Sequence, residues 1–307
     1  MSMPNLTPER LNELLVATSR TFAPAIALLP EPTRRVVGLA YLLFRVADTL
    51  EDAASWTKVA RIRALEELAR LLDAPDAGPA RATTERWLHA RPTDHAGYRA
   101  LLEATPALLE ATYALPEATR TIVRTHVLRT VAGMSGILER ASDDGTVELH
   151  SLEELRRYCY VVAGIVGELL TALFVHHAPQ LANVEPVLVE HQVAFGEALQ
   201  LVNILKDAGD DALEGRSFLP AGVARADVIA LARRDLDRAD AYNAALVRGG
   251  APAGFSAFTG LPAELARRNL DLLAGRGAGT KVPRAEVLQI YARYLTEASS
   301  ASAQTGK

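Results

Sequence analysis

Two stretches of the chain decide its fold: residues 36–52, VVGLAYLLFRVADTLED, and residues 198–211, ALQLVNILKDAGDD. In each stretch an apolar run leads into an aspartate, Asp48 or Asp207, which is followed by acids three and four residues later. On a helix three carboxylates at this spacing share one face. The pattern predicts two buried helices that each end in a cluster of carboxylates.

The rest of the chain shows helix signals and almost no strand signal. Runs that alternate apolar and polar residues are missing, whereas Thr7 before Pro8 and the capping box of Ser151 and Glu154 mark helix starts. The predicted fold class is all-α, with one domain over residues 1–307 and a disordered tail from about residue 299. We expect further helices at about 116–140, 185–211, 226–247, 262–274 and 284–298.

Composition excludes several classes of function. The 307 residues carry 33 Lys and Arg against 37 Asp and Glu, a net charge of −4, so the chain lacks the excess of cations that binds nucleic acid, and we expect no nucleic-acid partner. A hydrophobic fraction of 49% is that of a globular protein. The single cysteine, Cys159, permits no internal disulfide.

The longest apolar stretch is residues 159–175, CYVVAGIVGELLTALFV, which Glu168 interrupts. Its length approaches that of a membrane span, yet the charged segment SLEELRR precedes it, so we expect a buried core helix. The N-terminus shows no secretory signal. We therefore expect a cytoplasmic protein that contacts a membrane only peripherally.

The acidic segments favour binding of divalent cations over solvated helix ends. Carboxylates at the C-terminal end of a helix are poorly placed for its dipole, whereas hard oxygen ligands suit Mg²⁺, which also bridges to phosphate oxygens. Arg45, Lys206 and Arg216 flank the acids. Carboxylates and cations beside apolar walls predict a site for a metal-bound diphosphate with an apolar tail.

Four motifs in order resemble the squalene and phytoene synthases, which are head-to-head prenyl transferases. The resemblance lies in residues 19–22, SRTF; in residues 41–52, YLLFRVADTLED; in residues 158–167, YCYVVAGIVG; and in residues 199–216, LQLVNILKDAGDDALEGR. It implies an isoprenoid-synthase helical bundle around a central apolar cavity, with two facing helices that bear aspartates. Departures from the family pattern are Lys206, where Arg is usual, and Asp210, where Glu is usual.

The resemblance also implies roles for individual residues. Magnesium would be held by Asp48, Glu51, Asp52, Asn203, Asp207 and Asp211. The substrate diphosphate would be bound by Ser19, Arg20, Arg45, Gln200, Lys206 and Arg216. Tyr41 and Tyr158 would line the reaction pocket together with Arg45, and Tyr158 would assist proton removal.

A glycine-rich segment, residues 275–281, precedes two further cations. No strand comes before it and its spacing is not that of a nucleotide-binding loop, so we interpret it as a connector. Lys281 and Arg284 are candidates for binding a cofactor phosphate. Gly164 and Gly167 in the apolar stretch are expected to allow close helix packing or to leave room for a prenyl chain.

The predicted function is Mg²⁺-dependent condensation of two farnesyl diphosphates to presqualene diphosphate, followed by reduction to squalene with NADPH. The residues leave two alternatives open. One is a phytoene or dehydrosqualene synthase that works without NADPH, and the other is a non-catalytic partner subunit that binds prenyl diphosphates. The oligomeric state is also left open.

Overall fold

The computed structural model describes residues 6–19, 21–73, 77–142, 145–213, 218–276 and 280–305, and describes only the backbone of residues 77, 210–213, 276 and 300–305. Within these ranges the secondary structure is helical and contains no strand, which confirms the predicted all-α class. The chain divides into two compact units, unit 1 with residues 1–23 and 34–145 and unit 2 with residues 24–33 and 146–307. Whether these units act as one domain stays a prediction.

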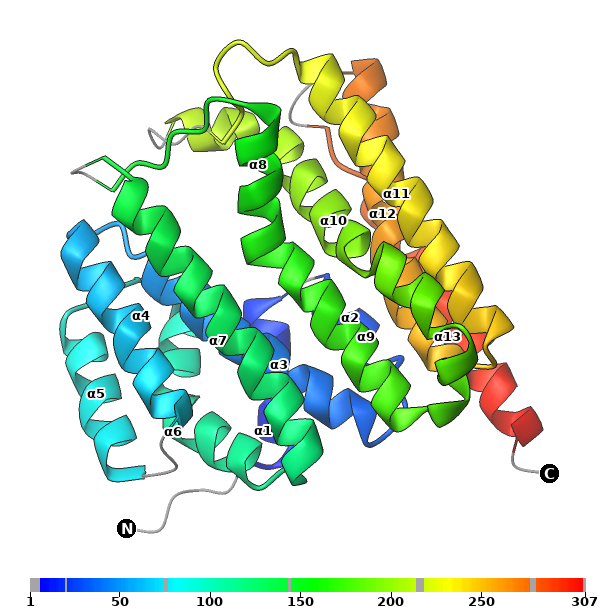
Figure 1. Ribbon diagram of the computed structural model, residues 1–307, viewed down its shortest axis with the longest axis horizontal. Coiled ribbons are helices and arrows are strands. Elements are labelled where there is room, and N and C mark those ends of the chain that lie inside the picture. Colours follow the sequence, from blue (N-terminus) through cyan, green and yellow to red (C-terminus); the bar gives the residue numbers. More distant parts are fainter. Residues whose placement is uncertain are drawn as a thin grey trace. The chain divides into compact units, whose positions relative to one another are not determined.

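Unit 1 is built around α3, a helix that is buried on nearly all of its faces. Leu39, Leu42, Leu43 and Leu50 along it have no exposed surface, because its sequence is apolar almost all round, as expected of a core helix. In the same unit α4 packs on α7 and α5 packs on α6 (Figure 1). The helices of unit 1 are α1 (Pro8–Thr18), α3 (Thr33–Glu51), α4 (Lys58–Asp73), α5 (Ala77–His89), α6 (Ala96–Tyr113) and α7 (Glu117–Arg140).

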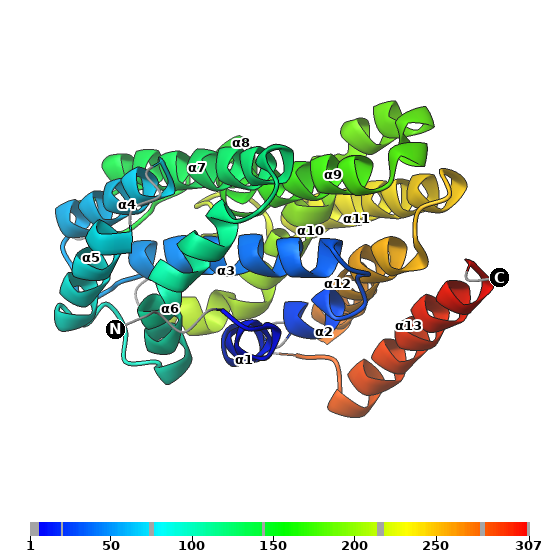
Figure 2. The same ribbon diagram turned by 90° about the horizontal axis from the view of Figure 1, so that it is seen from below.

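Unit 2 is built around α10, which packs against α9, α11 and α12. The short helix α2 (Phe22–Ile26) ends in this unit, and α13 packs on α12 at the edge of the unit (Figure 2). The other helices are α8 (Leu152–Cys159), the π-helix η1 (Tyr160–Gly164), α9 (Ile165–His177), the 3₁₀-helix η2 (Pro179–Asn183), α10 (Glu185–Leu213), α11 (Arg225–Arg248), α12 (Ala253–Arg276) and α13 (Arg284–Thr305).

Most of the observed helix boundaries agree with those predicted from the sequence, but the start of α12 does not. Its predicted start at residue 262 is wrong, because α12 begins at Ala253 and carries Pro262 in its interior. A proline inside a helix costs about 3 kcal/mol, but the flanking Leu261 and Ala263 are buried, so packing outweighs that cost. The backbone of α13 is helical as far as Thr305, which includes the stretch after residue 299 where a disordered tail was expected.

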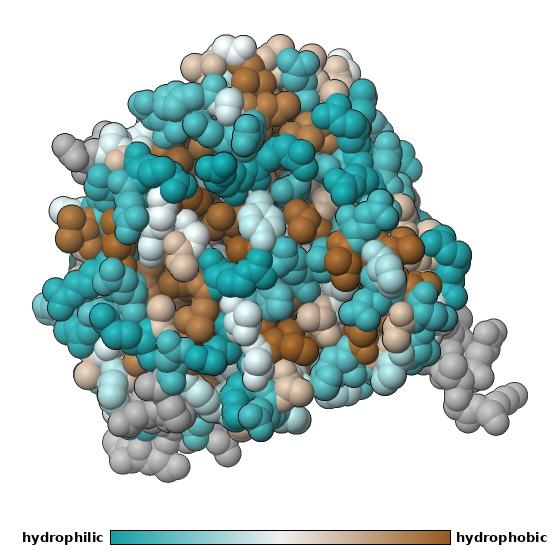
Figure 3. All heavy atoms as spheres, viewed as in Figure 1, coloured by the Kyte–Doolittle hydropathy of each residue, from teal (hydrophilic) through white to brown (hydrophobic). Residues whose placement is uncertain are grey.

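The apolar stretch of residues 159–175 lies in a continuous helical segment, Leu152–His177, made of α8, η1 and α9. Among the described helices this segment is long and apolar enough to span a membrane. Leu169, Leu170, Leu173 and Phe174 along it are nevertheless buried in the protein, and the Phe174 ring stacks on Phe255 with 4.1 Å between centroids. Figure 3, drawn in the view of Figure 1, shows hydrophobic residues interspersed among hydrophilic ones on that face of the molecule. These contacts agree with a core helix.

Glycines bring this segment into contact with the backbone of α10. A Cβ atom on Gly167 would lie 1.9 Å from the Gln192 carbonyl oxygen, and one on Gly196 would lie 2.0 Å from the Ala163 carbonyl oxygen. No real side chain tolerates such distances, so only glycine permits this approach. The close packing expected of Gly167 is therefore present.

We predict that Gly167→Ala destabilises the protein by about 2 kcal/mol or more, because the added methyl group must push two helix backbones apart. Thermal unfolding followed by circular dichroism would show a fall in Tm of several degrees. Gly275→Ala at the end of α12 is the matched control, since a Cβ there meets nothing within 4 Å, and it should leave Tm unchanged or slightly raised. Equal effects of the two changes would contradict the packing assignment.

Candidate functional site

The C-terminal end of α3 holds an arginine clamped between an acid and a phenol. Arg45 donates from Nη1 to Asp48 Oδ2 at 2.8 Å and from Nη2 to the Tyr98 hydroxyl at 2.6 Å. Its guanidinium carbon also lies 5.1 Å from the centre of the Tyr98 ring, a cation–π distance. The planar fork of arginine makes both bonds at once, which lysine would not. Arg45 is thereby fixed in direction next to the acidic segment.

The carboxylates at this end of α3 repel one another. Partial burial raises the pKa of Asp48 to about 6, with Arg45 opposing this rise and Asp52 adding to it. Burial also raises the pKa of Glu51 to about 8, helped by the negative charges of Asp52 and Asp48 and opposed by Arg61. Three acids thus stand against two arginines, and the local charge favours a bound proton or a bound cation.

Ser19 and Tyr41 form a second part of this end of the site in unit 1. The Ser19 hydroxyl accepts a hydrogen bond from the Phe22 N–H at 2.9 Å and also bonds to Tyr41, whose pKa is raised because the phenol is buried. The Phe22 and Tyr41 rings lie 5.5 Å apart. The structure therefore brings together Ser19 and Tyr41, while Arg20 lies outside the described residues.

The ligands predicted on α10 lie along that helix as far as the described side chains reach. Lys206 donates to Asn203 Oδ1 at 3.0 Å and lies 3.2 Å from Asp207 Oδ2. Gln200 lies two turns before Asp207 on the same helix, partly exposed like Lys206 and Asp207. Two predicted ligands cannot be placed: the side chain of Asp211 and the whole of Arg216 lie outside the described residues.

Tyr158 at the end of α8 is buried and stacks on Phe218, with 5.0 Å between ring centroids. Sequence reasoning missed Phe218, although it follows the predicted Arg216 by only two residues. It also missed Tyr98, which lies on α6 outside every motif, so that no signal pointed to it. The Glu168 that interrupts the apolar stretch accepts a hydrogen bond from the Tyr160 hydroxyl at 3.0 Å.

The two acidic segments belong to different units, Asp48 to unit 1 and Asp207 to unit 2. The expectation that their helices face each other therefore stays a prediction. Across the described part of the chain, no three His, Cys, Asp or Glu side chains lie close enough to hold a metal ion.

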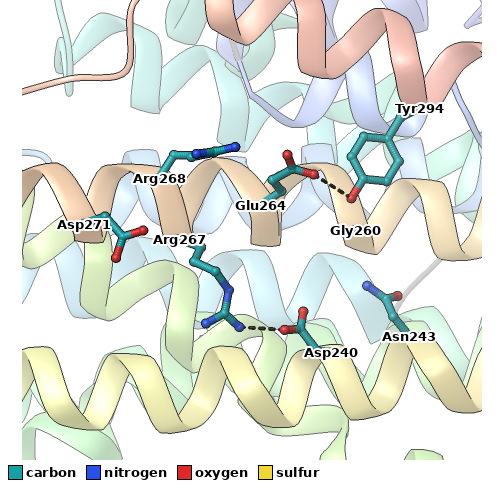
Figure 4. A pocket seen from close by; sticks show the side chains of 8 residues that line it. All are labelled: Asp240, Asn243, Gly260, Glu264, Arg267, Arg268, Asp271 and Tyr294. Atoms are coloured by element: carbon teal, nitrogen blue, oxygen red, sulfur yellow. Dashed lines mark hydrogen bonds and ion pairs between the residues drawn. The ribbon is translucent and has the colours of Figure 1, made fainter.

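The cations proposed for a cofactor phosphate lie at the start of α13. Lys281 and Arg284 are both exposed, and the Val282 N–H donates to Asn269 Oδ1 at 3.2 Å, which holds this segment on α12. A cavity of about 360 Å³ lies among α11, α12 and α13. Figure 4 shows Arg267 on its wall pointing to Asp240. None of the residues that line this cavity is a predicted site residue.

Two acids are buried in unit 2 outside the set of predicted site residues. Glu197, three residues before Gln200, is 5% exposed, and Asp235 on α11 is 2% exposed. Arg156, two residues before Tyr158, lies 3.4 Å from Glu197. Asp235 Oδ2 is buried and has no hydrogen-bond partner among the described residues. The ionic contact joins α8 to α10, and the charge of Asp235 on α11 adds to the rise in the pKa of Glu197.

Comparison with known proteins places these features in context. The family model for squalene/phytoene synthase matches residues 15–290. Squalene synthase ERG9 of Candida albicans is 31% identical over 218 residues, which cover 69% of this chain and 45% of that protein. Squalene synthase of Homo sapiens is 30% identical over 210 residues, 67% of this chain and 45% of that protein. The chain thus matches these relatives over slightly less than half of their length.

Solved structures agree on the fold. The complex of TcSQS with the ligand E5700 gives a TM-score of 0.72 at 22% identity and covers 95% of this chain and 90% of that chain. A dehydrosqualene synthase in complex with ligand gives a TM-score of 0.59 at 19% identity and covers 95% of this chain and 96% of that chain. At such identities the likeness concerns the fold, and it agrees with the all-α class predicted from sequence.

We predict that the buried acid pair makes stability fall as pH rises. Burial raises the pKa of Glu197 and of Asp235, so the folded state keeps protons that the unfolded chain has already lost, and the free energy of unfolding drops above the ordinary carboxyl range. Arg156 on α8 and Arg234 and Arg238 on α11 oppose the shift without abolishing it.

Asp235→Asn removes one of these protons, so the stability of this variant relative to the parent chain should rise as the pH increases above the ordinary carboxyl range. Urea unfolding at a series of pH values measures this difference. The exposed Asp94→Asn is the control and should track the parent at every pH. Parallel curves for Asp235→Asn and the parent would refute a raised pKa at this position.

Proposed function

Since the chain belongs to the squalene/phytoene synthase family, we propose that it joins two farnesyl diphosphates head to head to form presqualene diphosphate. The observation that carries the proposal is the end of α3, where Asp48, Glu51 and Asp52 gather beside the clamped Arg45. An excess of carboxylates beside an oriented arginine suits a diphosphate that binds together with divalent metal ions.

The donor set fits Mg²⁺, because it consists of carboxylate and amide oxygens whose mutual repulsion a cation relieves. The residues that would hold it are Asp48, Glu51 and Asp52 on the first segment and Asn203, Asp207 and Asp211 on the second. Bound Mg²⁺ would neutralise the charge that builds on the departing diphosphate.

Side chains with fixed direction would orient the diphosphate itself. Arg45 is held by two hydrogen bonds, and Lys206 is held between Asn203 and Asp207, so neither needs to reorganise when negative charge develops on the leaving group. Ser19, Arg20, Gln200 and Arg216 complete the proposed set of diphosphate ligands.

The carbocation steps that follow require a pocket that excludes water. When the C1–O bond of one farnesyl diphosphate breaks, the allylic cation is attacked by the double bond of the second substrate, and a proton leaves as the cyclopropane ring closes. Water would quench that cation, so apolar and aromatic side chains must surround it. Tyr41 packed on Phe22 and Tyr158 packed on Phe218 are proposed for these walls, with Tyr158 helping to accept the proton.

The reductive half-reaction, from presqualene diphosphate to squalene, is the finer part of the proposal. It requires a hydride from NADPH, and Lys281 and Arg284 are the proposed contacts for the cofactor phosphates because both are exposed cations at one helix start. We also propose that the chain contacts a membrane peripherally, where it releases its apolar product.

Product analysis by mass tests the function directly. The chain is incubated with farnesyl or geranylgeranyl diphosphate and Mg²⁺, with and without NADPH. We expect presqualene diphosphate from farnesyl diphosphate alone and squalene once NADPH is added. Dehydrosqualene or a forty-carbon product would overturn the choice of reaction or substrate, and absence of any condensation would favour a non-catalytic binding subunit.

We predict that Asp48→Asn and Asp207→Asn each lower kcat for Mg²⁺-dependent diphosphate release by about 100-fold or more, because each removes a charged oxygen ligand and keeps the shape of the side chain. Release of diphosphate from farnesyl diphosphate, measured over a range of Mg²⁺ concentrations, is the readout.

Glu103→Gln on the exposed side of α6 is the control for loss of a carboxylate and should keep full activity. Far-ultraviolet circular dichroism should match the parent for all three variants. A second readout is independent of turnover: Mg²⁺ with inorganic pyrophosphate should raise the Tm of the parent and of Glu103→Gln, but not that of Asp48→Asn. Unchanged turnover in both aspartate variants would remove the metal assignment.

A further inference from the structure

The two groups that hold the Arg45 guanidinium differ in charge. Asp48 accepts its hydrogen bond as a carboxylate, which compensates the positive charge of the arginine. The Tyr98 hydroxyl accepts the other bond, at 2.6 Å, without bringing a negative charge. The third donor, Arg45 Nε, is buried and has no hydrogen-bond partner among the described residues. Within the described part of the chain, the direction of the guanidinium therefore depends on Asp48 and Tyr98.

Asp48 has a second proposed task, and Tyr98 does not. As a proposed Mg²⁺ ligand, the Asp48 carboxylate is not reserved for the arginine. Tyr98 holds Arg45 through both its hydroxyl and its ring, whose centre lies 5.1 Å from the guanidinium carbon. Tyr98 is thus the contact that fixes the direction of Arg45 and leaves its positive charge free to act on an anion.

The start of α6 holds Tyr98 in place. His95 caps this helix, because its Nδ1 accepts a hydrogen bond from the Tyr98 N–H at 3.3 Å. The His95 and Tyr98 rings also lie close together, with 4.4 Å between their centroids. One residue therefore fixes both the backbone and the ring of Tyr98.

The first turn of α6 also rests on the backbone of α1. A Cβ atom on Gly97 would lie 2.5 Å from the Ala17 carbonyl oxygen, so only glycine permits this contact. Ala17 lies two residues before Ser19, whose hydroxyl bonds to Tyr41, and Tyr41 lies one turn before Arg45 on α3. These contacts run from α6 through α1 and α3 and return to α6, all within unit 1.

We propose that Tyr98 is a positioning residue that keeps Arg45 directed at the substrate diphosphate. The inference rests on the proposed function, in which Arg45 is a diphosphate ligand, and it adds a residue that lies outside all four sequence motifs. An arginine held by a neutral acceptor needs no reorganisation when charge develops on the leaving group, and it keeps its own charge. The first turn of α6 would then support Arg45 from one side and the Ser19 segment from the other.

Tyr113 supplies a matched control at the opposite end of α6. Its hydroxyl donates to the Leu72 carbonyl oxygen of α4, also at 2.6 Å, and like Tyr98 it is half-buried. Tyr113→Phe and Tyr98→Phe therefore each remove one hydroxyl hydrogen bond of the same length between two helices of unit 1. If the Tyr98 hydroxyl only stabilised the fold, the two variants would behave alike.

Diphosphate release from farnesyl diphosphate with Mg²⁺ is measured for the parent and both variants. We expect Tyr98→Phe to lower kcat about tenfold or more, since a hydrogen bond to a charged group is lost. KM should change by less than about threefold, as expected for an interaction that acts mainly in the transition state. Tyr113→Phe should keep the parent kcat, and the two variants should show similar falls in Tm.

A double-mutant cycle with Arg45→Lys separates positioning from a general loss of structure. Lysine lacks the planar fork of arginine, so in the Arg45→Lys chain a further Tyr98→Phe change should lower kcat by less than about twofold. The same four chains are titrated with inorganic pyrophosphate and Mg²⁺ in a calorimeter, which needs no turnover. We expect Tyr98→Phe to weaken pyrophosphate binding about tenfold with Arg45 present and hardly at all with lysine there.

The role of Tyr98 and the proposed reaction fail in different ways. If the parent makes presqualene diphosphate and Tyr98→Phe keeps the parent kcat and pyrophosphate affinity, the role of Tyr98 is overturned and the reaction stands. Equal losses from Tyr98→Phe with and without Arg45 would also overturn that role, because Tyr98 would then act independently of the arginine. If no condensation product forms but the pyrophosphate titrations give the expected cycle, the role of Tyr98 is supported and the reaction is wrong.

Discussion

The rest of the structure depends on one electrostatic constraint, an excess of negative charge on partly buried helix ends. At the end of α3, burial and mutual repulsion raise the pKa values of Asp48 and Glu51, and Arg45 compensates only part of that charge. A helix selected for stability alone would not retain such a cluster. In the proposed reaction the repulsion is useful, because it makes divalent cations, and the diphosphate they carry, favourable to bind.

The architecture around this constraint keeps polar groups and apolar walls apart. Along α3 most residues before Asp48 are buried and apolar, among them Leu42, Leu43 and Val46, so the carboxylates are confined to one end of a hydrophobic helix. In unit 2, Gly167 and Gly196 bring the α8–α9 segment against α10 at backbone contact, which leaves little space for water between them. Ionic groups at helix ends and dry packing along the helices are what a carbocation reaction needs.

Sequence reasoning predicted the all-α class, most helix boundaries and the acidic segment near the end of α10, because these follow from local periodicity and capping. It failed at α12, where tertiary packing keeps Pro262 inside a helix. It also missed Tyr98 and Phe218, since contacts such as Tyr98 to Arg45 join residues far apart in sequence. Whether the two acidic helices face each other depends on how the two units pack, which no local pattern encodes.

The central claim is that the acids of α3 and of α10 act on the same diphosphate. The most direct measurement is a crystal structure with Mn²⁺ and a non-hydrolysable farnesyl thiodiphosphate, with the metal located by anomalous scattering. The account predicts metal ions bound to Asp48 and to Asp207 that bridge one thiodiphosphate group. Metal at only one of these aspartates, or thiodiphosphate bound away from both, would contradict it.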